Sequence, residues 1–322
     1  MPEMDIQLIS GSANPELARA VAGKLRIPLS KRVLQRFPDG EVSFRLEQTI
    51  RGRDVYLLQS TGPPVDEHLV ELLVMIDGCR RASAGRITAL IPYYGYSRQE
   101  KKSRGREPIT ARLVADLLTV AGTGRVVSID LHAPAIQGFF NIGMEHLTAV
   151  PILIEHLRRH RQPDMVVVSP DTGRVKLAEK YARGLGVPMA VLHKERLGGA
   201  ETEVHAVIGD VRDRRPIIID DMITTGGTIR GAVQALLEAG ARAGMTVAAT
   251  HGLLVDGALD RLQDPAIAEV TITDTVPVPP EKRLPNMHLV SVAGLLAETI
   301  QRLNENRSIS ELFPPRYDHH PV

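Results

Sequence analysis

The sequence predicts an α/β protein with two tandem domains, each built around a largely parallel sheet. Its 322 residues correspond to about two domains of ordinary size. Short runs of β-branched and apolar residues alternate with longer helical patterns, and a similar alternation begins again near residue 149. Because strands that alternate with helices form βαβ units, parallel sheets are expected.

Short apolar runs predict the strands, and the longer helical patterns between them predict the helices. Several helices begin beside Pro or Thr and end near Gly, which are favoured at those positions. The predicted strands are residues 5–9, 54–59, 86–91, 125–129, 165–168, 188–192 and 215–219. The predicted helices are residues 15–25, 66–84, 109–121, 150–159, 175–185 and 229–239. We expect a first domain over residues 1–148, a second over 149–306 and an irregular tail over 307–322.

The composition indicates a soluble globular protein. Apolar residues make up 43% of the chain and charged residues 24%, and a net charge of +1 argues against a general polyanion binder. The single cysteine, Cys79, lies in an apolar helical pattern and cannot form an internal disulfide. No leader or membrane-spanning pattern is present, so we expect a cytoplasmic protein.

The strongest chemical pattern is the segment over residues 217–228, which predicts a strand, an acidic pair, a Thr/Gly loop and a helix start. In parallel sheets, ligands bind at the carboxyl ends of strands. Glycines let the backbone approach a phosphate, and the helix start offers free N–H donors. The acidic pair can accept hydrogen bonds from sugar hydroxyls or help to hold Mg²⁺. A phosphosugar site is therefore predicted, formed by Asp220, Asp221, Thr224, Thr225, Gly226, Gly227 and Thr228. A plain strand-to-helix turn is the alternative.

Two basic segments follow other predicted strands. Residues 98–106 carry five cations, which suit a polyphosphate, and Gln99 could bind a ribose or base edge. A solvated loop, or an RNA surface with the three nearby tyrosines, fits this segment as well. The second basic segment, residues 193–196, follows the strand predicted over residues 188–192. Its Lys194 and Arg196 side chains point to the same side if the chain is extended. They could stabilise phosphoryl charge beside a glycine-containing loop, although an exposed hairpin is equally compatible.

Three weaker signals also follow turns or strands. Residues 37–41 predict a turn that places Asp39 and Glu41 on one face, where a solvated turn is the simpler interpretation. His132 follows a strand, and such a histidine is more often a structural hydrogen-bonder than a ligand. Asp171 follows another strand, where helix capping competes with metal binding.

Taken in order, these segments resemble the ribose-phosphate pyrophosphokinase family across almost the whole chain. The resemblance rests on residues 36–41 (RFPDGE), 91–99 (IPYYGYSRQ), 106–111 (REPITA), 130–134 (DLHAP), 136–140 (IQGFF), 168–171 (VSPD), 193–196 (HKER) and 220–228. It implies two type I phosphoribosyltransferase-like domains, Mg²⁺-dependent use of ATP and ribose 5-phosphate, and a homo-oligomer, often a hexamer. The reaction would be attack by the sugar's C1 hydroxyl on the β-phosphorus of ATP, which releases AMP.

The resemblance also implies a role for each matched residue. Phe37, Asp39 and Glu41 would contact the adenine and ribose of an ATP molecule that is bound to a neighbouring subunit. ATP would further contact Arg98, Gln99 and His132, and Mg²⁺ would be placed by His132 and Asp171. Lys194 and Arg196 would be catalytic, together with His132. A regulatory phosphate or nucleoside diphosphate site at a subunit boundary would involve Thr49, Arg51, Ser83, Arg104, Ser308 and Ser310.

Three positions depart from the family pattern. Pro38 replaces the usual serine, and Thr224 replaces a frequent aspartate in the sugar loop. Arg174 replaces the second glycine that often follows the Pro-Asp step, and we expect it to add a cation near the sugar or the loop. Two alternatives remain at this stage: a phosphoribosyltransferase that consumes phosphoribosyl pyrophosphate, and an inactive subunit that regulates an active partner.

Overall fold

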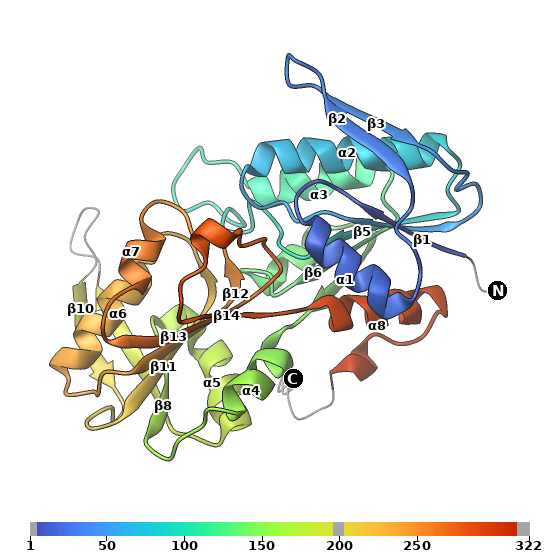
Figure 1. Cartoon of the computed structure of the whole chain (residues 1–322). Coiled ribbons are helices and arrows are strands. Elements are labelled where there is room, and N and C mark those ends of the chain that lie inside the picture. Colours follow the sequence, from blue (N-terminus) through green and yellow to red (C-terminus); the bar gives the residue numbers. More distant parts are fainter. Residues whose placement is uncertain (1–4, 196–202, 314–322) are drawn as a thin grey trace. The chain divides into compact units, whose positions relative to one another are not determined.

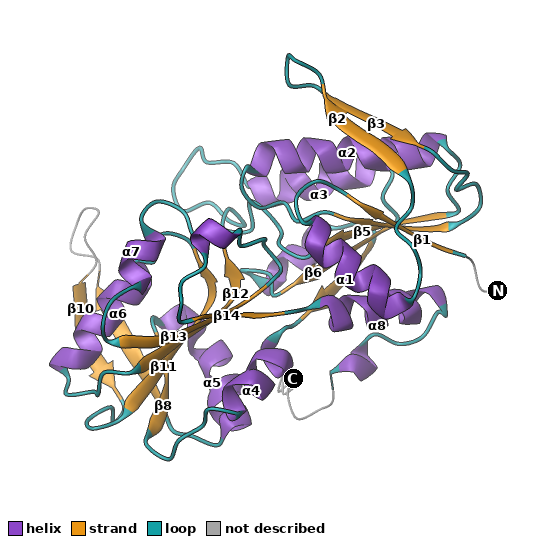
Figure 2. Cartoon of the chain, in the orientation of Figure 1, coloured by secondary structure: helices purple, strands orange, loops and turns teal. Residues whose placement is uncertain are grey.

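The computed structural model describes residues 5–195 and 203–313, which form two compact units (Figure 1). Unit 1 contains residues 5–148, 275–277 and 291–313, and unit 2 contains residues 149–195, 203–274 and 278–290. Figure 2 shows that helices and strands alternate along most of both units. None of the described helices is long and apolar enough to cross a membrane.

A five-stranded parallel sheet forms the centre of unit 1, in the order β1-β4-β5-β6-β7. Its strands are β1 (Ile6–Ser10), β4 (Asp54–Leu58), β5 (Arg86–Ile91), β6 (Arg125–Ile129) and β7 (Gly143–Leu147). The helices are α1 (Pro15–Leu25), α2 (Val65–Arg81), α3 (Thr110–Ala121) and α8 (Ala293–Asn304). Helices α2 and α3 cover one face, and α1 packs against α8 (Figure 1). Asn14 caps α1 by accepting a hydrogen bond from the Leu17 N–H.

An antiparallel hairpin projects from unit 1 beside α2 (Figure 1). It consists of β2 (Arg32–Arg36) and β3 (Val42–Leu46), and the tight turn between them uses Gly40 at a φ of +95°. Cys79 lies on the buried face of α2, as the apolar pattern predicts. Burial raises the pKa of this thiol to about 12, so it remains protonated at neutral pH.

A seven-stranded sheet forms the centre of unit 2, in the order β10-β9-β8-β11-β12-β13-β14. The strands are β8 (Met165–Ser169), β9 (Met189–Glu195), β10 (Glu203–Ile208), β11 (Arg215–Ile223), β12 (Met245–Gly252), β13 (Ile267–Thr273) and β14 (Met287–Val290). All neighbouring pairs are parallel except the β9–β10 hairpin. Helices α4 (Val150–Arg158) and α5 (Val175–Leu185) pack together, and α6 (Gly227–Glu238) packs with α7 (Ala258–Leu262).

The predicted strands and helices all form, with boundaries shifted by a few residues. The structure adds elements that were not predicted, including the hairpin, β7, β12–β14 and α8. It also groups residues 291–306 with unit 1, whereas the sequence analysis placed them in the second domain. The physical reason is the packing of α8 against α1, together with a polar contact between the end of α8 and the buried Asp54. Asp54 accepts a hydrogen bond of 2.9 Å from the Asn304 side chain at the end of α8 and is ion-paired with Arg86.

Candidate functional site

Three neighbouring strands of unit 2 bring predicted site residues to the same edge of the sheet. Lys194 lies near the end of β9, Asp171 follows β8, and Asp220 and Asp221 lie toward the end of β11. Because β9, β8 and β11 are adjacent and parallel, their carboxyl ends meet. Only the backbone of Lys194 is described, and Arg196 lies outside the described residues.

The acidic pair on β11 is largely buried and carries its own counter-ion. The Asp220 and Asp221 side chains are 13% and 7% exposed. The Arg174 guanidinium reaches both, with Nε 3.5 Å from Asp220 Oδ1 and Nη2 3.1 Å from Asp221 Oδ1. Burial raises the pKa of Asp220 well above its ordinary value, Asp221 raises it further, and Arg174 lowers it. The cation that the sequence analysis expected from Arg174 lies beside the acidic pair on β11.

The Thr/Gly loop follows directly after β11 and ends at the first residue of α6. Gly226 has a φ of +75°, a conformation that side chains with a Cβ rarely adopt, so glycine is required there. Thr225 and Thr228 are exposed, and α6 begins at Gly227 without a side-chain cap. The Gly227 N–H lies 3.4 Å from Thr225 Oγ1. An exposed helix N-terminus with glycine and threonine around it suits a phosphate group.

Asp171 acts as a cap at the start of the short 3₁₀ segment that precedes α5. Its Oδ1 accepts hydrogen bonds from the Gly173 and Arg174 N–H groups at 2.8 and 3.1 Å. The same backbone turn therefore places Arg174 toward β11. Within the described ranges, no group of three or more His, Cys, Asp and Glu side chains is arranged to hold a metal ion. The carboxylates of Asp171, Asp220 and Asp221 are nevertheless the hard oxygen ligands that Mg²⁺ prefers.

In unit 1, the predicted ATP residues follow two adjacent strands. Arg98 and Gln99 lie in the exposed loop after β5, and His132 follows β6 in a half-buried position. Gln99 Oε1 accepts a hydrogen bond of 2.6 Å from Thr110 Oγ1 at the start of α3. The residue before Leu131, Asp130, has a φ of +40°, so the chain turns sharply after β6. These residues share the carboxyl edge of the unit 1 sheet.

The other predicted ATP residues lie at the tip of the hairpin. Phe37 is 48% exposed, and Asp39 and Glu41 are exposed beside it. Asp39 Oδ1 accepts a hydrogen bond of 3.1 Å from the Glu41 N–H, which rigidifies the turn. An exposed aromatic ring with two carboxylates, projecting away from its own unit, can contact a ligand held elsewhere.

The sequence analysis missed the support beneath this hairpin. Glu71 on α2 is 2% exposed and accepts hydrogen bonds of 2.7 Å from the Ser12 N–H, the Ser12 hydroxyl and Gln59. It also lies 3.7 Å from the Arg36 guanidinium at the end of β2. Nothing in the local pattern of α2 distinguishes Glu71 from a solvated glutamate, because its partners come from other segments.

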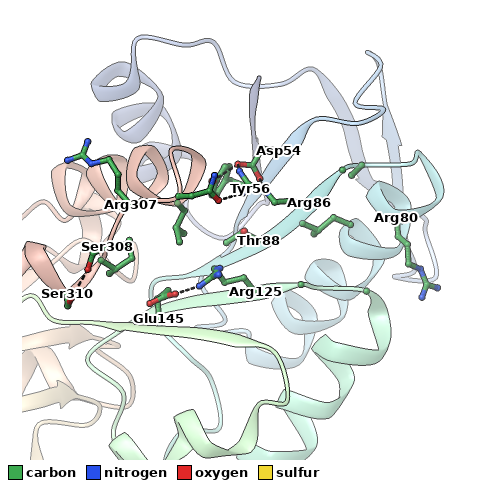
Figure 3. Close-up of a pocket in the computed structure, with 18 residues that line it drawn as sticks. Asp54, Tyr56, Arg80, Arg86, Thr88, Arg125, Glu145, Arg307, Ser308 and Ser310 are labelled. Carbon is green, nitrogen blue, oxygen red and sulfur yellow. Dashed lines mark hydrogen bonds and ion pairs between the residues drawn. The ribbon is translucent and has the colours of Figure 1, made fainter. Parts of the chain in front are cut away.

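A pocket of about 800 Å³ lies at the amino edge of the unit 1 sheet (Figure 3). Its wall includes Ser308 and Ser310, whose hydroxyls are 2.7 Å apart, and the arginines Arg86 and Arg125. Figure 3 shows Arg125 directed at Glu145, with which it forms an ion pair. This edge lies opposite the one that carries Arg98 and His132.

The residues predicted for regulation are only partly brought together. Ser308 and Ser310 line the pocket, whereas Thr49, Ser83 and Arg104 do not. Arg51 also lies outside the pocket lining, but its backbone pairs with Ala84, which does line it.

The two largely parallel sheets, with helices between their strands, define an α/β protein of the type I phosphoribosyltransferase-like class. The chain matches the N-terminal domain of ribose phosphate pyrophosphokinase over residues 6–122 and the phosphoribosyl synthetase-associated domain over residues 200–314. It is 46% identical to the ribose-phosphate pyrophosphokinase of Gloeobacter violaceus, over 97% of this chain and 94% of that protein. The Bacillus subtilis ribose-phosphate pyrophosphokinase is 44% identical, over 97% and 98% of the two chains.

A solved structure gives the same result. The phosphoribosylpyrophosphate synthetase from Mycobacterium smegmatis is 47% identical, with a TM-score of 0.89 over 94% of this chain and 99% of that chain. This chain belongs to the ribose-phosphate pyrophosphokinase family and is an enzyme with that activity. The predicted fold class and the resemblance stated from the motifs are both confirmed.

Proposed function

We propose that the chain transfers the β,γ-diphosphoryl group of Mg·ATP to the C1 hydroxyl of ribose 5-phosphate, with the sugar bound at the end of β11. The observation that carries this assignment is the junction of a buried acidic pair with an exposed Thr/Gly loop at the start of α6. The carboxylates of Asp220 and Asp221 accept hydrogen bonds from sugar hydroxyls. The N–H groups and hydroxyls of Thr224, Thr225, Gly226, Gly227 and Thr228 bind the 5-phosphate.

ATP is bound by residues of unit 1. Arg98 binds phosphate, Gln99 contacts the ribose or the base, and His132 contacts ATP as well. Phe37, Asp39 and Glu41 serve the nucleotide of a neighbouring subunit, because their exposure at a hairpin tip leaves them available to another chain. This assignment implies a homo-oligomer, and we infer a hexamer from the family resemblance.

Catalysis rests on alignment and on charge stabilisation. Lys194, near the end of β9, and Arg196, which lies outside the described residues, offset the negative charge of the transferring group. No covalent intermediate with the protein is required. Mg²⁺ would be held by carboxylate oxygens such as those of Asp171, and it would supply further charge neutralisation on the phosphate oxygens.

Regulation by phosphate or a nucleoside diphosphate is part of the same proposal. The hydroxyls of Ser308 and Ser310 and the guanidinium groups around the pocket suit an anion. Arg51, Thr49, Ser83 and Arg104 would complete the site in the assembled protein. We also infer a cytoplasmic location, since the single cysteine cannot form an internal disulfide and so suits a reducing compartment.

Formation of AMP from ATP and ribose 5-phosphate tests the reaction, and the variant Asp221→Asn tests the sugar site. We expect the variant to raise the KM for ribose 5-phosphate at least tenfold while the KM for ATP changes by less than about threefold, because its carboxylate faces sugar hydroxyls. Asp210→Asn, which alters an exposed carboxylate of unit 2, is the matched control. An unchanged sugar KM with weakened ATP binding would reverse the assignment.

A further inference from the structure

A basic loop, residues 98–106, is closed at its base by contacts to the start of α3. It lies between β5 and α3 and carries five exposed cations, Arg98, Lys101, Lys102, Arg104 and Arg106. Gln99 Oε1 accepts a hydrogen bond of 2.6 Å from Thr110 Oγ1. The Gln99 carbonyl accepts a second one of 3.2 Å from the Ala111 N–H. The two ends of the loop are therefore joined by one side-chain contact and one backbone contact.

The middle of the basic loop is folded by Glu107. Its Oε2 accepts hydrogen bonds from the Ser103 N–H at 2.7 Å and from the Arg104 N–H at 2.9 Å. Tyr96 and Arg106, which flank and end the loop, have φ values of +64° and +69°. Residues with a Cβ disfavour this conformation, so it persists only where surrounding contacts hold it. These contacts therefore keep the loop in a shape that the isolated segment does not favour.

The fold holds this loop through its backbone and leaves its cations for a ligand. Among the described residues, Lys101 is the only one of the five cations within 4.0 Å of a carboxylate, which is that of Glu100 at 3.4 Å. Like charges so close in sequence repel one another, so a loop without support would spread them apart. Guanidinium and ammonium groups that are gathered without carboxylate partners suit a polyphosphate.

We propose that Glu107 and Thr110 are positioning residues that preform the basic loop for the polyphosphate chain of ATP. This inference rests on the ATP site proposed above and deepens it, because Arg98 and Gln99 belong to the same loop. A loop that is already folded loses less conformational entropy when the nucleotide binds, so the affinity is higher. Two residues of the motif over residues 106–111 thus support the loop and need not contact ATP themselves.

The geometry at Glu107 allows positioning to be separated from charge. Both N–H groups donate to the same oxygen, so the amide oxygen of a glutamine can accept both hydrogen bonds, whereas alanine can accept neither. Either substitution removes a negative charge near the cations, so a purely electrostatic role predicts tighter ATP binding in both variants. Positioning predicts weaker ATP binding in Glu107→Ala alone.

The kinetic test uses Glu107→Ala, Glu107→Gln, Thr110→Val and Thr110→Ser in the full chain. We expect the KM for ATP to rise about tenfold in Glu107→Ala and about fivefold in Thr110→Val, while kcat and the KM for ribose 5-phosphate stay within about twofold. Glu107→Gln and Thr110→Ser should keep the KM for ATP below about twice the wild-type value. Thr119→Val is the matched control, because Thr119 also lies on α3 and its hydroxyl donates to the Ala115 carbonyl at 2.8 Å.

Limited digestion with trypsin measures the shape of the loop without ATP. Trypsin cuts after Lys and Arg where the chain opens locally, and the loop holds five such residues. Cleavage within residues 98–106 should be about tenfold faster in Glu107→Ala and Thr110→Val than in the wild type, and unchanged in the conservative variants and in Thr119→Val.

Three results would overturn the inference: an unchanged KM for ATP in Glu107→Ala, unchanged cleavage in that variant, or equal changes in Glu107→Ala and Glu107→Gln. The retained kcat and sugar KM exclude general misfolding as the cause of a raised KM for ATP. If Arg98→Ala leaves the KM for ATP unchanged, the ATP site itself is wrong, and the cleavage of the Glu107 variants is independent of that result.

Discussion

At the residue scale, the buried carboxylate of Asp220 lowers the stability of the folded protein but is proposed to bind the sugar. A carboxylate that is largely buried beside a second carboxylate is not the arrangement that maximises stability. Arg174, which follows the neighbouring strand β8, reduces this destabilisation by pairing with both carboxylates. Such a conflict between local stability and ligand binding is common at functional sites, because the ligand needs groups that the fold alone would not select.

The conflict predicts that Asp220→Asn stabilises the folded protein while it weakens sugar binding. The folded-state pKa of Asp220 is raised, so the native state binds more protons than the unfolded state, and stability is lost as pH rises through that raised value. The variant should be about 1 to 2 kcal/mol more stable at pH 7 and lose this advantage near pH 4. Thermal unfolding at both pH values measures the effect, with Asp210→Asn as an exposed control. A lower Tm at pH 7 would contradict the prediction.

Lys194 provides a second test at this scale. Because its ammonium group is proposed to act on charge that develops during transfer, Lys194→Ala should lower kcat by roughly 10² to 10⁴, or about 3 to 5 kcal/mol. The KM for ribose 5-phosphate should change little. Steady-state kinetics with each substrate varied gives both constants. Turnover close to the wild-type value would remove Lys194 from the mechanism.

At the scale of elements, the β2–β3 hairpin depends on a buried network in its own unit. Arg32 donates to the Ser10 carbonyl at 2.7 Å, and Arg36 is paired with Glu67 and lies near Glu71. Burial lowers the pKa of Arg32, and the charge of Glu71 opposes that shift. The position of the hairpin tip is therefore set by charges at its base.

We predict that Glu71→Gln loosens the hairpin and impairs ATP use more than sugar use. The amide would place an NH₂ group against the Ser12 N–H, hydroxyl or Gln59 donors, which should cost about 3 kcal/mol of stability. The KM for ATP should rise severalfold, and amide hydrogen exchange of residues 32–46 should accelerate. Glu67→Gln is the matched control, because Glu67 also pairs with Arg36 but is 55% exposed. Equal effects of the two variants would exclude the buried network as the cause.

A histidine cluster predicts acid sensitivity in unit 2, with His156 on α4, His160 just after it and His288 on β14. Burial lowers the pKa of His156, the neighbouring His288 and His160 lower it as well, and Glu269 at 3.5 Å opposes them. The unfolded chain therefore binds more protons, so stability is complete above the ordinary histidine value of 6.5 and falls as pH drops below it. His156→Gln should flatten the dependence of Tm on pH between about 5 and 7. If Tm falls as steeply with decreasing pH in the variant as in the wild type, groups other than His156 cause the fall.

At the scale of the whole molecule, the proposed phosphate site links activity to assembly. An anion that binds only the oligomer shifts assembly by mass action. Phosphate should therefore increase both activity and the oligomeric fraction, and Arg51→Ala should blunt both effects while the KM for ribose 5-phosphate stays within about twofold. Activity and sedimentation are measured after phosphate removal and again after its addition. Phosphate-independent activity and assembly in the wild type would refute regulation without affecting the catalytic proposal.

The sequence by itself determined the fold class, the family and the local elements. Strand and helix periods are local properties, so the strand over 215–219 and the helix over 229–239 were predictable from a few residues each. The Thr/Gly loop is likewise continuous in sequence, and it forms the strand-to-helix junction that its glycines predict.

Only the tertiary structure decided which distant groups meet. Arg174 lies 46 positions before Asp220, and the register of β8 and β11 brings them together. The return of α8 to unit 1 depends on its packing against α1 and on Asp54, which lies 250 positions before its partner Asn304. The support of the hairpin depends on Glu71. Side-chain periodicity reports which face of an element is buried, but the identity of a partner depends on packing between elements that are remote in the chain.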